Sequence, residues 1–246
     1  MNGKSIIKFL VVVAVIIGTF AYCIEPLAGS LKQGLDLQGG THIVLEAEDS
    51  ATGKADNDAV ERAKQILERR INEMGLSEPL VQREGARRII IELPGVKDPD
   101  EAIKRIGKTA VLEFKNDQGQ TVMTGDDLKD AKEELGQNKQ PLVAIELSDE
   151  GAKKFADLTS KNIGRRIAIT LDGQELTNPV VQQAITGGKA TISGSKSLEE
   201  AKDLAILLRS GALPVKINVL EVRTVGPSLG QDSKDKSVVA FSSGIA

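Results

Sequence analysis

The sequence predicts an α+β protein in which an N-terminal transmembrane helix precedes a ferredoxin-like base domain that carries a small inserted α+β head domain. An uncharged apolar run lies near the N-terminus, and beyond it strand-like segments of period two alternate with segments of helical period. A long middle segment interrupts this order before a last helix and strand. The predicted boundaries are 1–25 for the transmembrane helix, 31–115 with 196–224 for the base, 116–195 for the head, and 225–246 for a linker.

The apolar run near the N-terminus supports a membrane anchor. Lys4 and Lys8 precede residues 9–24, which carry no charge, and with two preceding isoleucines about 20 residues are available to span a bilayer. The basic flank predicts a cytoplasmic N-terminus, so that everything from Glu25 onward lies outside the cytoplasm. A cleaved signal peptide shares these features, but the run is long and no small-x-small cleavage site follows it. A lipoprotein site at Cys23 is disfavoured by the large residue before it.

The base begins with a strand at residues 41–47, in which apolar and polar residues alternate after the pair Gly39–Gly40. We expect one of these glycines to have a positive φ or to lie against another backbone, because the strand starts immediately afterwards. Apolar residues three or four apart predict a helix over 56–74. Turn and capping signals add the remaining elements: strands at 80–83 and 89–93, a helix capped by Asp98, and a strand at 110–114.

The middle segment predicts a separate small domain. Its expected elements are a helix at 125–135, a strand at 142–147, a helix from Ser148 to Gly164, a strand at 167–171 that enters a hairpin through Asp172–Gly173, and two short strands flanking Gly187–Gly188. Ser197 then caps a last helix that ends at Gly211, and residues 214–222 form a last strand. We expect this helix and strand to pack back onto the base, which makes the head an insertion.

The composition excludes several classes of site. Aromatic residues make up 2% of the 246 residues and the net charge is −3, which argues against a nucleic-acid partner. Cys23 is the single cysteine, so no intramolecular disulfide can form. His42 is the single histidine, which excludes a metal site built from several His or Cys ligands. We expect His42 to be a polar residue on one face of its strand.

No motif indicates an enzyme. Gly187-Gly188-Lys189 superficially resembles a phosphate-binding loop, but Gln183 and Ala190 occupy its diagnostic positions. Many carboxylates are present, and none is marked by spacing as an acid/base pair. The sequence therefore predicts no enzymatic activity, no cofactor, and no catalytic, cofactor-binding or metal-binding residues.

Two separated motifs resemble a known family. Residues 34–46 (GLDLQGGTHIVLE) and 223–230 (RTVGPSLG) closely resemble motifs of the SecD family of bacterial protein-export membrane proteins, which belongs with SecF to the resistance-nodulation-division superfamily. The resemblance extends over nearly the whole chain and covers the N-terminal portion of the family's sequence. It marks motif positions for which we expect a structural or hinge role: Gly34, Asp36, Gln38, Gly39, Gly40, Arg223, Gly226, Pro227 and Gly230.

The resemblance implies the first membrane span and extracytoplasmic domain of a Sec translocon accessory subunit in the bacterial cell (inner) membrane. Such a subunit assists export driven by the proton motive force by holding and releasing emerging preprotein. The implied partners are SecF, the SecYEG channel, unfolded preprotein and the lipid bilayer. Residues 225–246 would contain the start of a second transmembrane helix, and the family's proton-carrying residues would lie in later helices that this sequence lacks.

Two alternatives from other classes remain at this point. The first is a substrate-gathering extracytoplasmic domain of a resistance-nodulation-division efflux transporter, where ferredoxin-like units also occur; the two motifs favour the export family. The second is a membrane-anchored enzyme, against which the lone histidine and the missing motifs weigh.

The insertion suggests a hinge. Its two expected connections, near Asn116–Gly119 and near Gly194–Ser195, are short, polar and contain glycine. We hypothesise that the head rotates on the base while it holds unfolded chain through exposed apolar surface or open strand edges.

Overall fold

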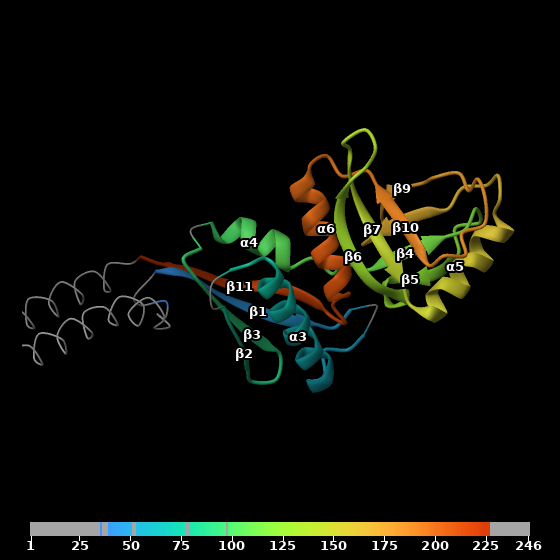
Figure 1. The fold of residues 1–246 in the computed structure, drawn as a ribbon. Coiled ribbons are helices and arrows are strands. Elements are labelled where there is room, and N and C mark those ends of the chain that lie inside the picture. The colour runs from blue at the N-terminus through green and yellow to red at the C-terminus, as the bar shows by residue number, and fades with distance from the viewer. Residues whose placement is uncertain (1–34, 36–38, 51–52, 77–78, 97, 227–246) are drawn as a thin grey trace, which may run out of the picture.

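A computed structural model describes residues 35, 39–50, 53–76, 79–96 and 98–226, which form a mixed α+β fold (Figure 1). The predicted membrane anchor at 1–25 and nearly all of the predicted linker lie outside these residues. Within the described ranges, no helix is both long and apolar enough to cross a membrane.

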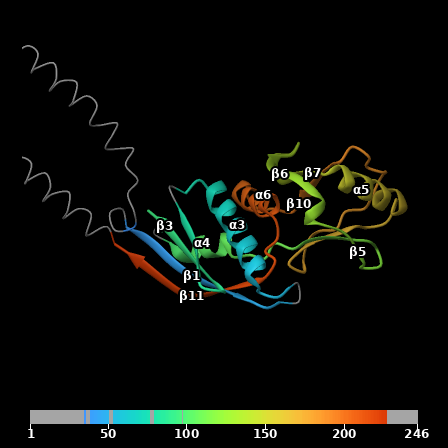
Figure 2. The same cartoon turned by 90° about the horizontal axis from the view of Figure 1, so that it is seen from below.

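One unit, which we call the base, is a four-stranded antiparallel sheet covered by two helices. Its elements are β1 Gly40–Glu48, α3 Asn57–Glu73, β2 Leu80–Glu84, β3 Arg88–Pro94, α4 Pro99–Ile106 and β11 Lys216–Val225. The strand order is β11-β1-β3-β2. Because α3 follows β1 and α4 follows β3, the connectivity is that of a split β-α-β unit whose last strand, β11, comes from the far end of the described chain (Figures 1 and 2).

Side-chain alternation in β1 determines which face of the base sheet is covered. Ile43, Leu45 and Ala47 are buried in one core with the apolar stripe of α3. The side chain of Asp56 caps α3 by accepting a hydrogen bond from the Ala59 N–H at 2.8 Å, and Asp98 caps α4 in the same way. The predicted elements of the base from β1 to α4 are thereby confirmed.

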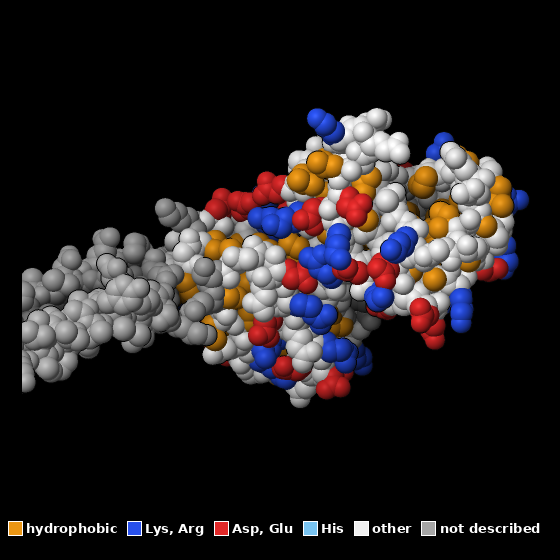
Figure 3. All heavy atoms as spheres, viewed as in Figure 1, with side chains coloured by type: hydrophobic (Ala, Val, Ile, Leu, Met, Phe, Trp, Pro, Cys, Tyr) orange, Lys and Arg blue, Asp and Glu red, His pale blue; other side chains and the backbone are white. Residues whose placement is uncertain are grey.

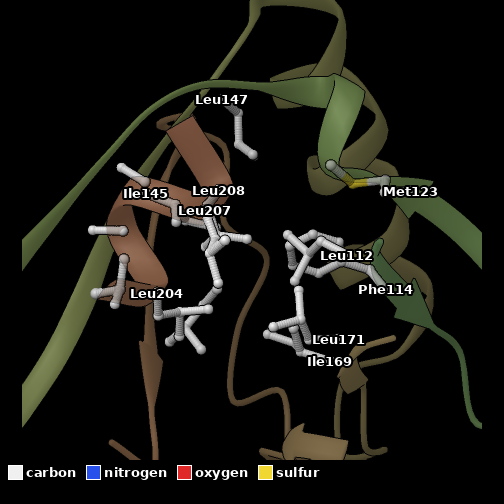
Figure 4. Close-up of a cluster of buried hydrophobic side chains, with 14 of the residues drawn as sticks. Leu112, Phe114, Met123, Ile145, Leu147, Ile169, Leu171, Leu204, Leu207 and Leu208 are labelled. Carbon is white, nitrogen blue, oxygen red and sulfur yellow. The ribbon is translucent and has the colours of Figure 1, made fainter. Parts of the chain in front are cut away.

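The other unit, which we call the head, combines two antiparallel sheets with two helices. Its elements are β4 Leu112–Lys115, β5 Thr121–Thr124, β6 Leu128–Leu135, β7 Pro141–Leu147, α5 Asp149–Lys161, β8 Ala168–Leu171, β9 Gln174–Thr177, β10 Lys189–Ser193 and α6 Leu198–Ser210, with a 3-10 turn at Gly125–Asp127. One sheet has the order β10-β7-β6 and the other β5-β4-β8-β9. Their shared core contains Leu204, Leu207 and Leu208 of α6, which lie across from Leu112 and Leu171 of the second sheet (Figure 4).

The helix predicted at 125–135 is wrong. Residues 125–127 form the 3-10 turn, and 128–135 form β6, which pairs with β7 in antiparallel register. The segment is rich in helix-forming residues, but as a strand it buries Ala131 in the core of the head while the flanking Asp130 and Lys132 are more exposed. Tertiary pairing here overrides local helix propensity.

Three further expectations need correction. The strand expected at 110–114 in the base forms two residues later as β4 and joins the head sheet. Helix α6 was expected on the base, yet its apolar residues belong to the core of the head, and only β11 returns to the base sheet. Of the two strands expected beside Gly187–Gly188, β10 alone forms among the described residues. Before the glycines the chain makes single bridges at Val180 and Val181.

Candidate functional site

The glycine pair that precedes β1 is held against the end of β3. Gly39 has a φ of 68° and Gly40 a φ of 148°, as the position before a strand led us to expect. A Cβ on Gly40 would lie 2.3 Å from the carbonyl oxygen of Leu93, so no side chain fits there. The Gly95 N–H donates to the Gly39 carbonyl at 3.0 Å. The glycine pair therefore packs the start of β1 directly against the backbone at the end of β3.

The structure brings the two family motifs together. Gly40 pairs with Val225 and His42 with Arg223 across β1 and β11, although about 180 residues separate them in sequence. His42 also lies 3.4 Å from Glu92 on β3, as a polar residue on the uncovered face. The start of β1 and the end of β11 lie at the end of the base far from the head (Figures 1 and 2).

Not every motif position falls within the structure. Gly39, Gly40, Arg223 and Gly226 are described, and Arg223 forms an ion pair with Glu221. The others lie outside the described residues: Gly34, Asp36, Gln38, Pro227 and Gly230.

The base and the head are joined by two connectors, residues 107–111 and 211–215, that run side by side. The Leu213 N–H donates to the Thr109 carbonyl at 2.8 Å. Asp172, in the β8–β9 turn of the head, accepts hydrogen bonds from the Ala110 and Val111 N–H groups at 3.0 and 2.9 Å. The expected connection at 116–119 is instead the β4–β5 turn inside the head.

Arg70 of α3 links both connectors and is fully buried. Its guanidinium donates to the carbonyls of Ile106 at 2.7 Å, Gly211 at 2.8 Å and Lys108, and to the Ser210 hydroxyl at 3.1 Å. No described residue forms an ion pair with it; the charge faces the C-terminal ends of α4 and α6, where the helix dipoles are negative. Burial lowers the pKa of Arg70 to about 10, so the side chain stays charged at neutral pH.

The helical spacing of apolar residues in α3 marks Arg70 as an unusual position in the sequence. It lies three residues after the buried Leu67 and beside Ile71, within the apolar stripe of α3. A charged residue on a buried stripe indicates a specific partner.

Ion pairs flank Arg70 at the border between base and head. Arg105 of α4 pairs with Asp203 of α6, and Arg209 of α6 pairs with Glu73 of α3 at 2.7 Å. Hydrogen bonds to these carboxylates raise the pKa of both arginines. Charged side chains of both signs intermix over this border (Figure 3). All of these residues are partly exposed, so the pairs can separate at small cost in solvent.

The head contains a groove of about 760 Å³. It lies between the β10-β7-β6 sheet and a wall formed by α5, β8 and the segment 179–185. Its apolar lining is Ala131, Ala144, Ile145, Phe155, Ile167, Ile169, Pro179, Val180, Val181, Ile185 and Ala190. The size and the apolar lining are those of a binding site, and we regard this groove as the candidate site.

The segment 179–185 is fixed at several points. The Val181 N–H donates to the Arg165 carbonyl at 2.9 Å, and the Ile185 N–H donates to the buried Thr159 hydroxyl at 3.0 Å. Val180 is nevertheless 46% exposed, and Ile163 beside it is 55% exposed. The wall thus offers apolar surface on a defined backbone.

The rim of the groove carries charges of both signs. Lys132 pairs with Asp130 at 2.9 Å, and Lys129 pairs with Glu146 at 2.6 Å. Hydrogen bonds from these lysines lower the pKa of both carboxyls. In these two pairs, charges of opposite sign lie beside each other.

No group of three or more His, Cys, Asp or Glu residues in the described part of the chain could hold a metal ion. Sequence reasoning did not identify the groove, because its lining comes from six segments spread between residues 130 and 191.

Comparisons with known proteins agree with this architecture. Three family models match: the SecD/SecF GG motif over residues 31–51, the N-terminal part of the P1 domain of protein translocase subunit SecDF over 60–119, and the SecDF P1 head subdomain over 103–215. The protein translocase subunit SecD of Acidaminococcus fermentans is 57% identical over 246 residues, which is all of this chain and 59% of that relative.

Solved structures match as well. A crystal structure of SecDF in a super-membrane-facing form matches with a TM-score of 0.73 at 38% identity, over 97% of this chain and 38% of that one. A second chain, from a study of SecDF as a membrane component that enhances protein export, matches with a TM-score of 0.67 at 40% identity. This match covers 74% of our chain and 99% of the solved chain. The chain spans 51 to 59% of the length of the first three curated relatives it matches.

Proposed function

The chain belongs to the SecD family of protein translocase subunits, and from this premise we propose that it is the first membrane span and extracytoplasmic domain of an accessory subunit of the Sec translocon. It assists protein export driven by the proton motive force, together with SecF and the SecYEG channel. Its head holds emerging unfolded preprotein and releases it again. The observation that carries this proposal is the groove of about 760 Å³ in a unit that two adjacent connectors join to the base.

The proposed topology places residues 1–25 in the bacterial inner membrane with a cytoplasmic N-terminus. The chain enters the base sheet at Gly40 and leaves it at Val225, and both residues lie at the end of the base far from the head (Figure 1). A transmembrane span before Gly40 or after Val225 would therefore place the head away from the bilayer. Mass spectrometry of the membrane-extracted protein tests the anchor. We expect residues 1–24 to be retained, and a mature N-terminus near Gly29 would rule the anchor out.

We propose that the functional boundary between base and head lies at the connectors 107–111 and 211–215. This moves the hinge away from the positions near Asn116–Gly119 and Gly194–Ser195. At the connectors, few backbone torsions change when the head rotates as a unit, and Arg70 holds the two connectors together. The family-motif glycines Gly39 and Gly40 have a structural role in this scheme, because they pack the start of β1 against the end of β3.

A reversible lock tests whether head movement contributes to export. Arg105→Cys and Asp203→Cys, in a Cys23→Ser background, place one thiol on the base and one on the head. A short bis-methanethiosulfonate joins them, and reductant releases them. We expect the locked subunit to reduce export by the complete translocase and reduction to restore it.

The matched control carries Asp157→Cys and Lys161→Cys, one helical turn apart on α5 within the head. Joining these two should leave export unchanged. Equal export before and after reduction of the base–head lock would refute head movement as part of the mechanism.

A further inference from the structure

One free backbone edge of the head groove belongs to β10. This strand pairs with β7 alone, and the Leu147 N–H donates to the Gly188 carbonyl at 2.8 Å in the same register. In an antiparallel ladder alternate residues bond to the same neighbour, so Ala190 directs its backbone groups to β7. Lys189 and Thr191 therefore direct their N–H and C=O groups away from β7.

A second free edge lies across the groove at Val180. Two hydrogen bonds flank this residue: from the Val181 N–H to the Arg165 carbonyl at 2.9 Å, and from the Ile167 N–H to the Pro179 carbonyl at 3.1 Å. Val180 bridges Arg166 between them, in a pair that does not itself exchange hydrogen bonds. Its own N–H and C=O groups thus point away from residues 165–167.

Both edges line the same groove. Among the described residues, the outward backbone groups of Lys189, Thr191 and Val180 have no hydrogen-bond partner. Free strand edges with exposed flanking side chains favour pairing with another strand. This groove, which we call the seam, is therefore bounded on one side by the free edge of β10 and on the other by the outward backbone groups of Val180 in its isolated bridge.

We propose that an extended segment of unfolded polypeptide enters this seam as an added β-strand that pairs with β10 through Lys189 and Thr191 and with the edge at Val180. This deepens the proposed holding function and rests on it. The five residues of β10 offer an edge of about 17 Å. Every second side chain of the added strand would meet the apolar lining, for example Ile145 and Phe155.

Strand addition explains how one groove accepts many sequences. The hydrogen bonds involve the backbone of the ligand, which every sequence shares, and the rim carries charges of both signs. With few aromatic anchors, the contacts stay weak enough for release.

The test measures binding of a fluorescein-labelled ten-residue peptide, in which valine alternates with serine between terminal lysines, to the full chain in lipid nanodiscs. Two analogues carry N-methyl groups on either set of alternate amides. Thr191→Pro removes the outward N–H of β10 at an edge position that tolerates proline, and Thr191→Ala is its matched control. We expect the analogues and Thr191→Pro to weaken binding at least tenfold and Thr191→Ala to leave it unchanged.

The outcomes distinguish a failure of strand addition from a failure of the proposed holding function. If the peptide binds and neither N-methylation nor Thr191→Pro weakens binding, strand addition is wrong while the holding function stands. If the unmodified peptide does not bind the wild-type chain, the holding function fails as well. Amide exchange provides a readout that does not depend on the proline variant: exchange at residues 189–193 should slow when peptide is bound, and unchanged exchange would overturn the proposal.

Discussion

The base and the head are both built on antiparallel sheets, but their sheets end in different ways. In the base, Gly40 packs against the Leu93 carbonyl, and two helices pack on one face. In the head, β10 and the bridge at Val180 leave backbone groups unpaired along a groove. The difference suggests a division of labour. A sheet packed under helices keeps its shape under load, whereas unpaired backbone along a groove can accept a chain of any sequence.

The largest effect is expected in the sheet of the base. Gly40→Ala places a Cβ 2.3 Å from the Leu93 carbonyl oxygen, so backbone must move, and we expect the free energy of unfolding to fall by about 3 kcal/mol or more. Gly75→Ala is the control, because Gly75 has a φ of 73° but no neighbour within 4 Å of the added Cβ. It should cost about 1 kcal/mol. Urea denaturation measures both; equal losses would mean that the contact at Gly40 does not hold the base.

The junction between the two regions should be nearly as sensitive. Arg70→Met leaves the carbonyls of Ile106, Lys108 and Gly211 without their donor, and we expect a loss of about 3 kcal/mol in unfolding free energy. Limited proteolysis should then cleave the connectors 107–111 and 211–215 faster than the turns of the head. An Arg70→Met chain as stable and as resistant as wild type would show that packing alone joins base to head.

The ion pair at the border should contribute less. A double-mutant cycle with Glu73→Gln and Arg209→Met is expected to give a coupling energy of about 1 kcal/mol or below, because both side chains are partly exposed. The coupling should fall further at 1 M salt. A coupling of about 3 kcal/mol would indicate a rigid border and would contradict a head that rotates.

The smallest effect concerns the rim of the groove. A hydrogen bond from Lys132 lowers the pKa of Asp130, so Lys132→Met should raise that pKa toward its ordinary value in a carboxyl NMR titration. Since the folded pKa lies below the unfolded one, the associated stabilisation is present above the unfolded pKa and is lost as the pH falls through the folded pKa. The Lys132→Met variant should therefore lose less free energy of unfolding than the wild type when the pH falls through this range. Lys161→Met on α5 is the control; an Asp130 pKa that is equal in both variants would contradict the assignment.

The sequence predicted the base better than the head, for a physical reason. Elements from β1 to α4 carry their own signals, such as the cap at Asp98 and the buried stripe through Leu67. In the head, β6 consists of residues that favour a helix, and its pairing with β7 decides its structure. Local patterns cannot report that choice.

The groove and the junction at Arg70 could not be predicted from local sequence patterns, because residues far apart in the chain form them. The groove exists only where β6, β7, β10 and α5 meet the segment 179–185. The partners of Arg70 lie 36 to 141 residues away in the chain. The motif positions Gly39 and Gly40 were visible in the sequence because backbone conformation there depends on the residue itself.

Spin-label distance measurements test the central claim, that the head moves as a unit on a fixed base, most directly. Labels at Glu84 of the base and Leu135 of the head report on the border, while labels at Leu135 and Lys161 report within the head; all three residues are exposed. The full chain, in a Cys23→Ser background, is measured in nanodiscs with and without an arrested unfolded chain. We expect the base–head distance distribution to be broad and to shift when the chain is bound, while the distribution within the head stays narrow and unchanged. A base–head distribution that is equally narrow and does not shift would contradict the account.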